Sequence, residues 1–597
     1  MQSLREGIDI GVDEAESKLD FRGFPRNPPS EPDTRCGLSK VLYKWYQRSQ
    51  ILGPFTRSEA KERNLIINPI HGVPKSDGSV RPVINNSNPK KQYHLSVNGH
   101  IIEPLKTVKY PSLRSIVANI DAEGKGCWVW SRDLEDGYFN CIVKEEQCRF
   151  LAFEWADRIW IPTVMVFGLS SAPRIFTQFM LGPLKAIRME DTSVSYRTKL
   201  QSEVDQLIYE NEIDVEVEGD MVRYPLIKAY VDDIIGLHKD RAHATQQFIN
   251  AGRVLKRFQL KAKEKKDQRP SQLPIVLGAL IDTKKRRVFL THKKAEKYIS
   301  DIMSIIKSRK RIHISRLFTI IGRARHAAMF LRMLGVFARN LDTYVHSNWG
   351  NTIPVDDNLV RDLEWVVWCL RRAESTGISF DHILKPANAN DVTGYTDAAT
   401  VVGGVGGFLD HSDGTYFQCK WSDISLQNAA KRDIQWRELS AVFLLIKLNV
   451  RRLAHKAITA WCDNSPSVWM ITKCRAPLQR PDLQEILNQL AKLLIQNEIH
   501  LWMEHIPGVK NVTADKLSRY YPNPLKECRF RDQLRPNPPQ KVQRELQRIA
   551  TQCRALEIQR LQQANKAKLC APPMSFKRKH RHIHTGKNRR RKIQARR

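Results

Sequence analysis

Two aspartates stand side by side in an apolar stretch of the sequence, "AYVDDIIGLHKD", at residues 229–240. Asp232 and Asp233 are flanked by aromatic and β-branched residues, a pattern typical of buried strands. Burying one carboxylate costs free energy unless a partner compensates its charge, and burying two adjacent ones costs more. A divalent cation offsets both the repulsion and the lost hydration. We therefore expect Asp232 and Asp233 to lie at a tight hairpin and bind metal, the alternative being an ordinary turn with exposed acids.

The same tripeptide, Val-Asp-Asp, recurs at residues 355–357 in a different setting. There it follows Pro354 and precedes a stretch with apolar residues at helical spacing. Acidic residues at the start of a helix accept hydrogen bonds from its free N–H groups and suit its positive end. We therefore expect Asp356 and Asp357 to be structural.

Charge is the strongest signal in the composition, because 97 Lys and Arg outnumber 63 Asp and Glu and leave a net charge of +34. Only 11 of these basic residues lie in the tail at 577–597, so the excess is spread along the chain. Such an excess favours a polyanionic partner, most simply nucleic acid, over a basic protein with a solvated surface.

The sequence shows none of the features that mark secreted or membrane proteins. No apolar run reaches the ~18 residues of a membrane span, and the N-terminal segment has acidic residues and no apolar stretch of the signal-peptide kind. The 11 cysteines form no C-x-x-C pair, which argues against a paired-cysteine zinc site and a disulfide scaffold. We expect an intracellular protein, nuclear or cytoplasmic, with no membrane partner; the sequence leaves its oligomeric state open.

The elements that must position the aspartates follow from the hydrophobic pattern. Short β-branched runs alternate with helical stretches over 61–290, and 291–350 is predicted to be helical. The polar stretch 191–220 predicts an insertion or a long exposed helix. A second α/β region spans 391–525, and a basic helix at about 540–568 precedes the basic tail.

Further motifs occur in the order found in reverse transcriptases, which the Y-V-D-D stretch also resembles. In "SRDLEDGYFNCIV" (131–143), the resemblance implies that Asp133 is the third metal ligand and that Tyr138 lies under the incoming sugar and excludes a 2′-hydroxyl. Asp136 is also common at its position in that family. Asp133, Asp232 and Asp233 would then hold two Mg²⁺ ions, with Mn²⁺ as a substitute, and transfer nucleotides from dNTPs to a primer.

Three other segments carry the same resemblance and imply contacts with the substrates. "VFGLSSAPRIFTQFM" (166–180) would place the turn at Gly168, and a helix with Phe176 and Gln178, against template and nucleotide. "HGVPKSDGSVRPVINNSNP" (71–89) would be a hairpin whose Lys75 and Arg81 close on the triphosphate, and "VLGALID" (276–282) would grip the primer end through Leu277 and Gly278. Lys263, Lys265 and Lys266 are alternative donors of a proton to pyrophosphate.

Four acids in the C-terminal region have the spacing of a ribonuclease H site. They are Asp397 in "GYTDAATVV", Glu438 in "DIQWRELSAV", Asp463 in "AITAWCDNSPSV" and Asp515 in "HIPGVKNVTADKLSR". Such a quartet can bind two metal ions about 4 Å apart and hydrolyse a phosphodiester in line. His505 is a candidate for helping product release. The sequence T-D-A-A around Asp397 departs from the Gly or Ser that often follows this Asp, but small residues remain at the turn.

The strings "LSSAPRIF", "NPKKQYHLSVNGH" and "HIPGVKNVTADKLSR" are most similar to polyproteins of DIRS-type, tyrosine-recombinase retrotransposons. The resemblance covers about 40–520 and implies an α+β multidomain protein, a right-hand polymerase followed by an α/β ribonuclease H-like domain. The expected divisions are an N-terminal extension (1–60), fingers and palm (61–290), thumb (291–350), connection (351–390), ribonuclease H-like domain (391–525), and a basic helix and tail (526–597).

The implied partners are an RNA template, a DNA primer, RNA/DNA hybrid and dNTPs. The basic helix and tail would add a salt-dependent grip on nucleic acid, and the tail could also serve nuclear import. Two alternatives stay open: a domesticated nucleic-acid-binding protein without polymerase activity, and a nuclease whose polymerase half is a scaffold.

Overall fold

The computed structural model divides the chain into two compact units, residues 1–389 and 390–597, which are considered separately. Its description covers residues 6–12, 19–75, 78–108, 110, 113–190, 195–198, 216–218, 221–224, 226–347, 351–384, 392–400, 403–424, 432–526 and 528–569. Side chains are described for these residues except 195–198, 216–218, 221–224, 347 and 559–569. No helix in this part of the chain is both long and apolar enough to cross a membrane.

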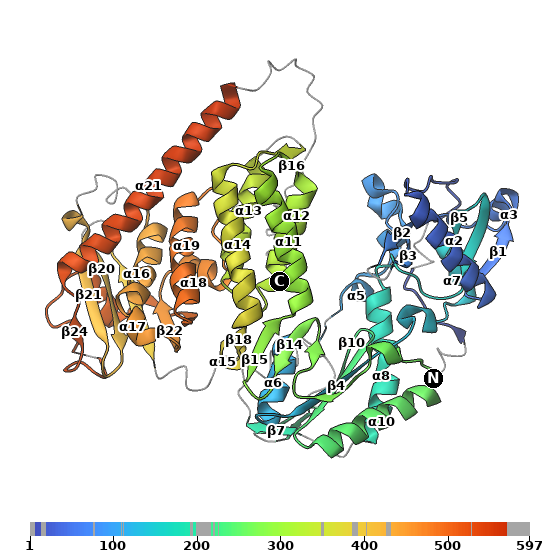
Figure 1. The fold of residues 1–597 in the computed structure, drawn as a ribbon, viewed down its shortest axis with the longest axis horizontal. Helices are drawn as coiled ribbons and strands as arrows, with labels where there is room; N and C mark the ends of the chain where they lie inside the picture. The colour runs from blue at the N-terminus through green and yellow to red at the C-terminus, as the bar shows by residue number, and fades with distance from the viewer. Residues whose placement is uncertain are drawn as a thin grey trace, which may run out of the picture. The chain divides into compact units, whose positions relative to one another are not determined.

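The central sheet of the first unit is antiparallel and contains the expected hairpin (Figure 1). Its strands lie in the order β10 (Ile227–Tyr230), β11 (Asp233–His238), β4 (Trp128–Asp133) and β12 (Gln268–Ser271). Helices α8 (Ala172–Met189) and α10 (Arg241–Arg257) pack against these strands. Tyr230 pairs with Asp233, so only two residues form the turn between β10 and β11. The prediction of a tight hairpin is confirmed.

The N-terminal part of this unit contains a sheet of β1 (Ile51–Phe55), β6 (Arg158–Pro162) and β5 (Phe153–Trp155), and a hairpin of β2 (Ile70–Pro74) and β3 (Val80–Ile84). Helix α2 (Pro32–Gln47) packs against β2 and β3 and buries Leu38, Leu42 and Trp45. Residues 1–60 were expected to form an extension. The structure instead builds α2 and β1 into the core of the unit.

Four helices follow, as the pattern after 291 predicts: α11 (His292–Ser308), α12 (Ile314–Ala327), α13 (Leu334–Ser347) and α14 (Asp357–Ser375). Helix α14 packs against the other three. The Asp356 side chain accepts a hydrogen bond from Leu359 N at 2.9 Å, and Asp357 pairs with Arg309 at 2.5 Å. The structural interpretation of the second Val-Asp-Asp tripeptide is therefore confirmed.

Besides a two-stranded pair of β16 (Ile312–His313) and β17 (Thr352–Ile353), two smaller sheets complete this unit. One consists of β13 (Ile275–Val276), β14 (Ala279–Asp282), β15 (Arg287–Leu290) and β18 (Ile378–Ser379). The other consists of β7 (Ser195–Thr198), β9 (Met221–Tyr224) and β8 (Glu216–Glu218). The described residues of the polar stretch 191–220 are thus strands and not a long helix; its remaining residues lie outside the described ranges.

The second unit is a six-stranded mixed sheet with helices on both faces. Its order is β23 (His500–His505), β22 (Ala457–Cys462), β19 (Thr393–Ala398), β20 (Gly404–Asp410), β21 (Thr415–Lys420) and β24 (Arg535–Pro536). Strands β22 and β23 run parallel to β19, whereas β20 is antiparallel to it. A Cβ added at Gly394 would meet Leu445, and one at Gly406, which pairs with Asp397 on the other face, would meet Leu517. Helices α16 (Ile434–Leu448) and α20 (Val512–Ser518) therefore cover opposite faces.

The long helix α21 (Pro539–Leu569) belongs to this second unit (Figure 1). It packs against α19 (Pro481–Gln496), β21 and α16. Val542, Leu546 and Cys553 are fully buried on its inner face. The expected division at 525/526 thus does not separate the basic helix from the α/β domain, because an apolar stripe docks the helix on it. The tail at 577–597 lies outside the described residues.

Two candidate carboxylate sites

The first site is at one end of the β10–β11–β4 sheet, where three aspartates meet. Asp133, the last residue of β4, is paired directly with Asp233, the first residue of β11. Leu134 N donates to the Asp232 backbone oxygen at 2.9 Å, so the turn residue lies beside the same strand end. Val231 has φ of +54°, a left-handed conformation that strains a β-branched residue. The structure thus brings together all three aspartates of the predicted site.

Two lysines partly compensate these charges. Lys263 Nζ lies 2.8 Å from Asp133 Oδ1, and Lys266 Nζ lies 2.7 Å from Asp133 Oδ2. Burial, together with the charges of Asp232 and Asp133, nevertheless raises the pKa of Asp233 to about 6. Three carboxylates thus share two ammonium groups, and their oxygen-only donor set fits Mg²⁺. Of the three lysines expected as alternative proton donors, Lys263 and Lys266 are bound to Asp133, and Lys265 is exposed.

Tyr138 lies beside the aspartates on an aromatic platform. Its ring centroid is 5.1 Å from that of Phe167 and 5.5 Å from that of Phe176. Burial raises the pKa of its hydroxyl to about 12, with smaller contributions that include the Asp232 charge. A Cβ added at the preceding Gly137 would lie 3.5 Å from Asp232 Cβ, so the platform adjoins the carboxylates.

The turn at Gly168 is fixed by a residue that sequence reasoning missed. The Asn98 amide donates to Gly168 O at 2.9 Å, and its oxygen accepts from Ser170 N at 2.9 Å. Asn98 is buried and lies within "LSVNGH", a string that served only as a mark of resemblance. Its neighbours, Val97 and Gly99, form no pattern that marks this role in the sequence. Gly168 itself has φ of +109°, and a Cβ there would lie 1.8 Å from Ile84 O.

Gly168→Ala should lower the free energy of unfolding by about 2–5 kcal/mol, because it adds backbone strain to a steric clash. Gly322→Ala is the matched control, since its Cβ meets nothing within 4 Å in helix α12. That control should instead raise stability by up to about 1 kcal/mol. Denaturant unfolding of both variants measures the difference, and equal effects would contradict the assigned role of Gly168.

The other predicted substrate-binding residues lie on the β2–β3 hairpin and on α8. The Arg81 guanidinium lies 4.7 Å from the Phe167 ring centroid, next to the Tyr138 platform. Lys75 is exposed at the end of β2, on the same hairpin as Arg81, and residues 76–77 at the tip lie outside the described ranges. Gln178 is exposed on α8.

The predicted primer-gripping residues form the turn between β13 and β14. Leu277 and Gly278 both have positive φ, +50° and +76°. Lys294 Nζ donates to Gly278 O at 3.3 Å. Gln268 of β12 donates to Ile275 O at 2.6 Å, so the turn is hydrogen-bonded to the central sheet that carries the aspartates.

The second site is at the carboxyl ends of parallel strands in the other unit. Asp397 lies near the end of β19 and Asp463 directly follows β22, its parallel neighbour. Glu438 reaches the same edge from α16, and Asp515 from α20. Charge interactions link all four carboxylates. His505 Nε2 lies 3.1 Å from the backbone oxygen of Asp463.

The charges of this quartet are also under-compensated. Burial, opposed by a hydrogen bond from Ser518, raises the pKa of Asp397 to about 6. Burial also raises the pKa of Glu438 well above its ordinary value, and Cys462 Sγ lies 3.7 Å from Glu438 Oε2. Ligand atoms of Glu438, Cys462 and Asp463 lie within 4.8 Å of one another, which suits a metal ion. Arg519, which pairs with Asp515 at 2.7 Å, was not anticipated from the sequence.

Mg²⁺ should raise the melting temperature at about pH 7.5 and do so far less at about pH 5. Asp233 and Asp397 both have a pKa of about 6, above the ordinary 3.8, so protons compete with the metal below pH 6. Without metal, the stability itself depends on pH in the opposite direction. The folded state binds more protons than the unfolded state, so stability increases as pH falls from about 6 to 4. Differential scanning fluorimetry at matched ionic strength measures both trends. Equal Mg²⁺ effects at the two pH values would contradict this account.

Structural comparison finds foamy viral reverse transcriptases among the similar solved structures. Foamy viral protease-reverse transcriptase in complex with dsDNA has a TM-score of 0.45 and 14% identity, over 83% of this chain and 90% of that one. The dRH form in complex with dsDNA has a TM-score of 0.44 and 14% identity, over 81% and 71%. The complex with RNA/DNA hybrid has a TM-score of 0.41 and 13% identity, over 83% and 78%. No protein-family model and no curated protein matches the sequence.

Proposed function

We propose that this chain is an RNA-directed DNA polymerase of a retroelement, of the DIRS type, which also cleaves the RNA strand of RNA/DNA hybrids. The observation that carries the proposal is the direct pairing of Asp133 with Asp233 beside the turn that holds Asp232. Three carboxylates at one strand end, with incomplete compensation by lysine, are suited to divalent metal ions, which can in turn bind a triphosphate.

At the polymerase site, Mg²⁺ when bound would activate the primer 3′-hydroxyl and neutralise the triphosphate. Asp133, Asp232 and Asp233 would hold the ions. Tyr138, supported by Phe167 and Phe176, would present its ring to the sugar of the incoming dNTP. Arg81 and Lys75 would bind the triphosphate as cations. Lys263 or Lys266, which pair with Asp133 in the structure, or Lys265 would donate a proton to pyrophosphate.

At the second site, Asp397, Glu438, Asp463 and Asp515 would hold Mg²⁺, or Mn²⁺ as a substitute, which would activate water for phosphodiester hydrolysis. Arg519 holds the Asp515 side chain and is close enough to favour ionised Asp397 and Asp463. His505, ordered against the backbone of Asp463, would assist release of the cleaved RNA. The partners are then an RNA template, a DNA primer, the hybrid and dNTPs, inside the cell.

Incorporation of dNTPs on a primed RNA template, with and without Mg²⁺, tests the proposal. We expect extension that requires Mg²⁺ and cleavage of the RNA in a labelled hybrid. Nucleic-acid binding with no Mg²⁺-dependent extension and no cleavage would favour the domesticated binding protein. Cleavage without extension would favour a nuclease with a polymerase-like scaffold.

A further inference from the structure

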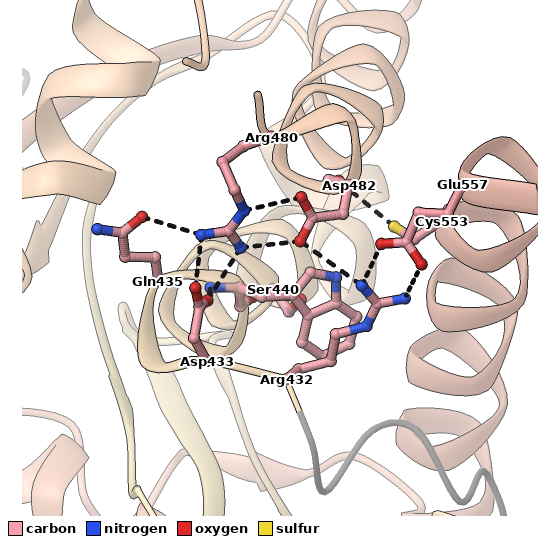
Figure 2. A network of polar contacts seen from close by, with 9 residues as sticks. Arg432, Asp433, Gln435, Ser440, Arg480, Asp482, Cys553 and Glu557 are labelled. Atoms are coloured by element: carbon pink, nitrogen blue, oxygen red, sulfur yellow. Dashed lines mark hydrogen bonds and ion pairs between the residues drawn. The ribbon is translucent and has the colours of Figure 1, made fainter. Parts of the chain in front are cut away.

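Helices α16, α19 and α21 are joined by a network of ion pairs in the second unit (Figure 2). Arg432 precedes α16 and forms a two-pronged contact with Glu557 of α21, at 2.5 and 3.1 Å. Arg480, at the start of α19, contacts Asp433 at 2.5 Å and Asp482 at 2.8 Å. Arg432 also lies 3.6 Å from Asp482, which closes the network between the two arginines.

The centre of the network is shielded from water. The side chains of Arg432 and Asp482 are only 13% and 6% exposed. Cys553 of α21 adds a contact from its Sγ to Asp482 O at 3.4 Å. In such surroundings the ion pairs are weakly screened, and removing one partner leaves a charge without compensation. Glu557, whose side chain is 34% exposed, compensates the charge of the shielded Arg432 from the edge of the network.

The network acts on the end of α16 that carries a predicted metal ligand. Asp433 caps this helix, because its carboxylate accepts a hydrogen bond from Trp436 N at 3.0 Å. Glu438 lies five residues further along, about 7.5 Å at ~1.5 Å per residue. Arg437, between them, donates to Ala399 O at 3.1 Å, close to Asp397 on β19. The first turns of α16 are thus held by the network on one side and by the β19 strand end on the other.

We propose that α21 is a clasp for the second carboxylate site, that is, a helix whose ion pairs hold the start of α16 in place. Glu557 and Arg432 are then positioning residues that keep Glu438 in the orientation needed for metal binding. The inference rests on the proposed ribonuclease function and adds a C-terminal helix to its machinery. The apolar contacts of α21 through Val542, Leu546 and Ile549 are separate from Glu557 along the helix. Loss of the Glu557 carboxylate should therefore loosen Glu438 while α21 stays docked.

Glu557→Gln in the full chain tests the clasp. A group hydrogen-bonded to a metal ligand typically contributes 10–100-fold to metal affinity, and Glu557 acts one step further out, through Arg432 and α16. The Mg²⁺ concentration for half-maximal RNA cleavage should therefore rise by less than that, about threefold. Primer extension by the same protein should be unchanged. Glu557→Asp keeps the charge and should retain most of the Mg²⁺ affinity. Glu545→Gln is the matched control, since it breaks the 3.0 Å Arg548–Glu545 pair on the same helix, outside the network.

A readout independent of cleavage separates this inference from the proposed function. Mn²⁺ binding is titrated by calorimetry in Asp232→Asn/Asp233→Asn protein, and the portion lost in Glu438→Gln is assigned to the second site. Weaker Mn²⁺ binding in Glu557→Gln supports the clasp even if the wild type cleaves no hybrid, which would overturn only the ribonuclease proposal. A lower melting temperature with unchanged Mn²⁺ affinity and Mg²⁺ requirement overturns the clasp. Absence of any Glu438-dependent binding overturns both.

Discussion

Replacing Asp232 and Asp233 together with Asn should reduce dNTP incorporation on a primed RNA template by about 10³-fold or more. The amides keep the shape of the hairpin but cannot supply the negative charge that holds the metal ions opposite Asp133. Cleavage of the RNA strand in a hybrid should persist, because the second quartet belongs to a different compact unit. Parallel assays of extension and cleavage on one preparation measure both effects.

The sequence provides a matched control for this variant. Asp356→Asn/Asp357→Asn alters the same Val-Asp-Asp tripeptide where it caps α14 and pairs with Arg309. That variant should keep full incorporation and lose at most about 1 kcal/mol of stability. The Asp232/Asp233 variant should be no less stable than wild type without metal at about pH 7.5, since repulsion with Asp133 is removed. Loss of both activities in the hairpin variant would refute two separate sites.

Replacing Asp463 with Asn should have the complementary effect, a loss of hybrid cleavage by about 10³-fold with incorporation unchanged. Asp463 follows β22 at the edge where Asp397 and Glu438 meet, and its pKa is raised by burial and by the Asp515 charge. The Asn side chain cannot supply the negative charge with which Asp463 would hold a metal ion. A labelled RNA strand in a hybrid, resolved by electrophoresis, gives the cleavage rate.

Asp532→Asn is the control for that experiment. Its side chain is 84% exposed in the same unit and pairs only locally with Arg531 among the described contacts. It should change neither activity nor stability by a measurable amount. Residual cleavage near the wild-type rate in Asp463→Asn would show that the quartet does not hold the catalytic metal.

Local patterns in the sequence were sufficient for the features that depend on nearby residues. The two-residue hairpin at 231–232 follows from apolar strands on either side of two acids, and the cap at Asp356 follows from its place before a periodic stretch. Both rest on backbone geometry and hydrophobic spacing, which act over a few residues. The seven acids were chosen by type and order, and the structure gathers them into two groups.

Long-range contacts were decided only by the tertiary structure. The register of β4 against β11 sets Asp133 opposite Asp233, and side-chain reach sets Lys263 and Lys266 on Asp133. Neither can be read from spacing, since a shift of one residue in register would turn the carboxylate to the other face. Asn98, which holds the Gly168 turn, is likewise visible only once the two segments are packed together.

The basic C-terminal helix shows the same division most clearly. Its charge and helical periodicity are properties of the sequence, and they predicted a helix with an affinity for nucleic acid. Whether its apolar stripe packs against other helices depends on the shape of the surface formed by α16 and α19, which no local pattern encodes. The sequence therefore determined the helical structure and the positive charge of this segment, and tertiary packing determined that it belongs to the α/β unit.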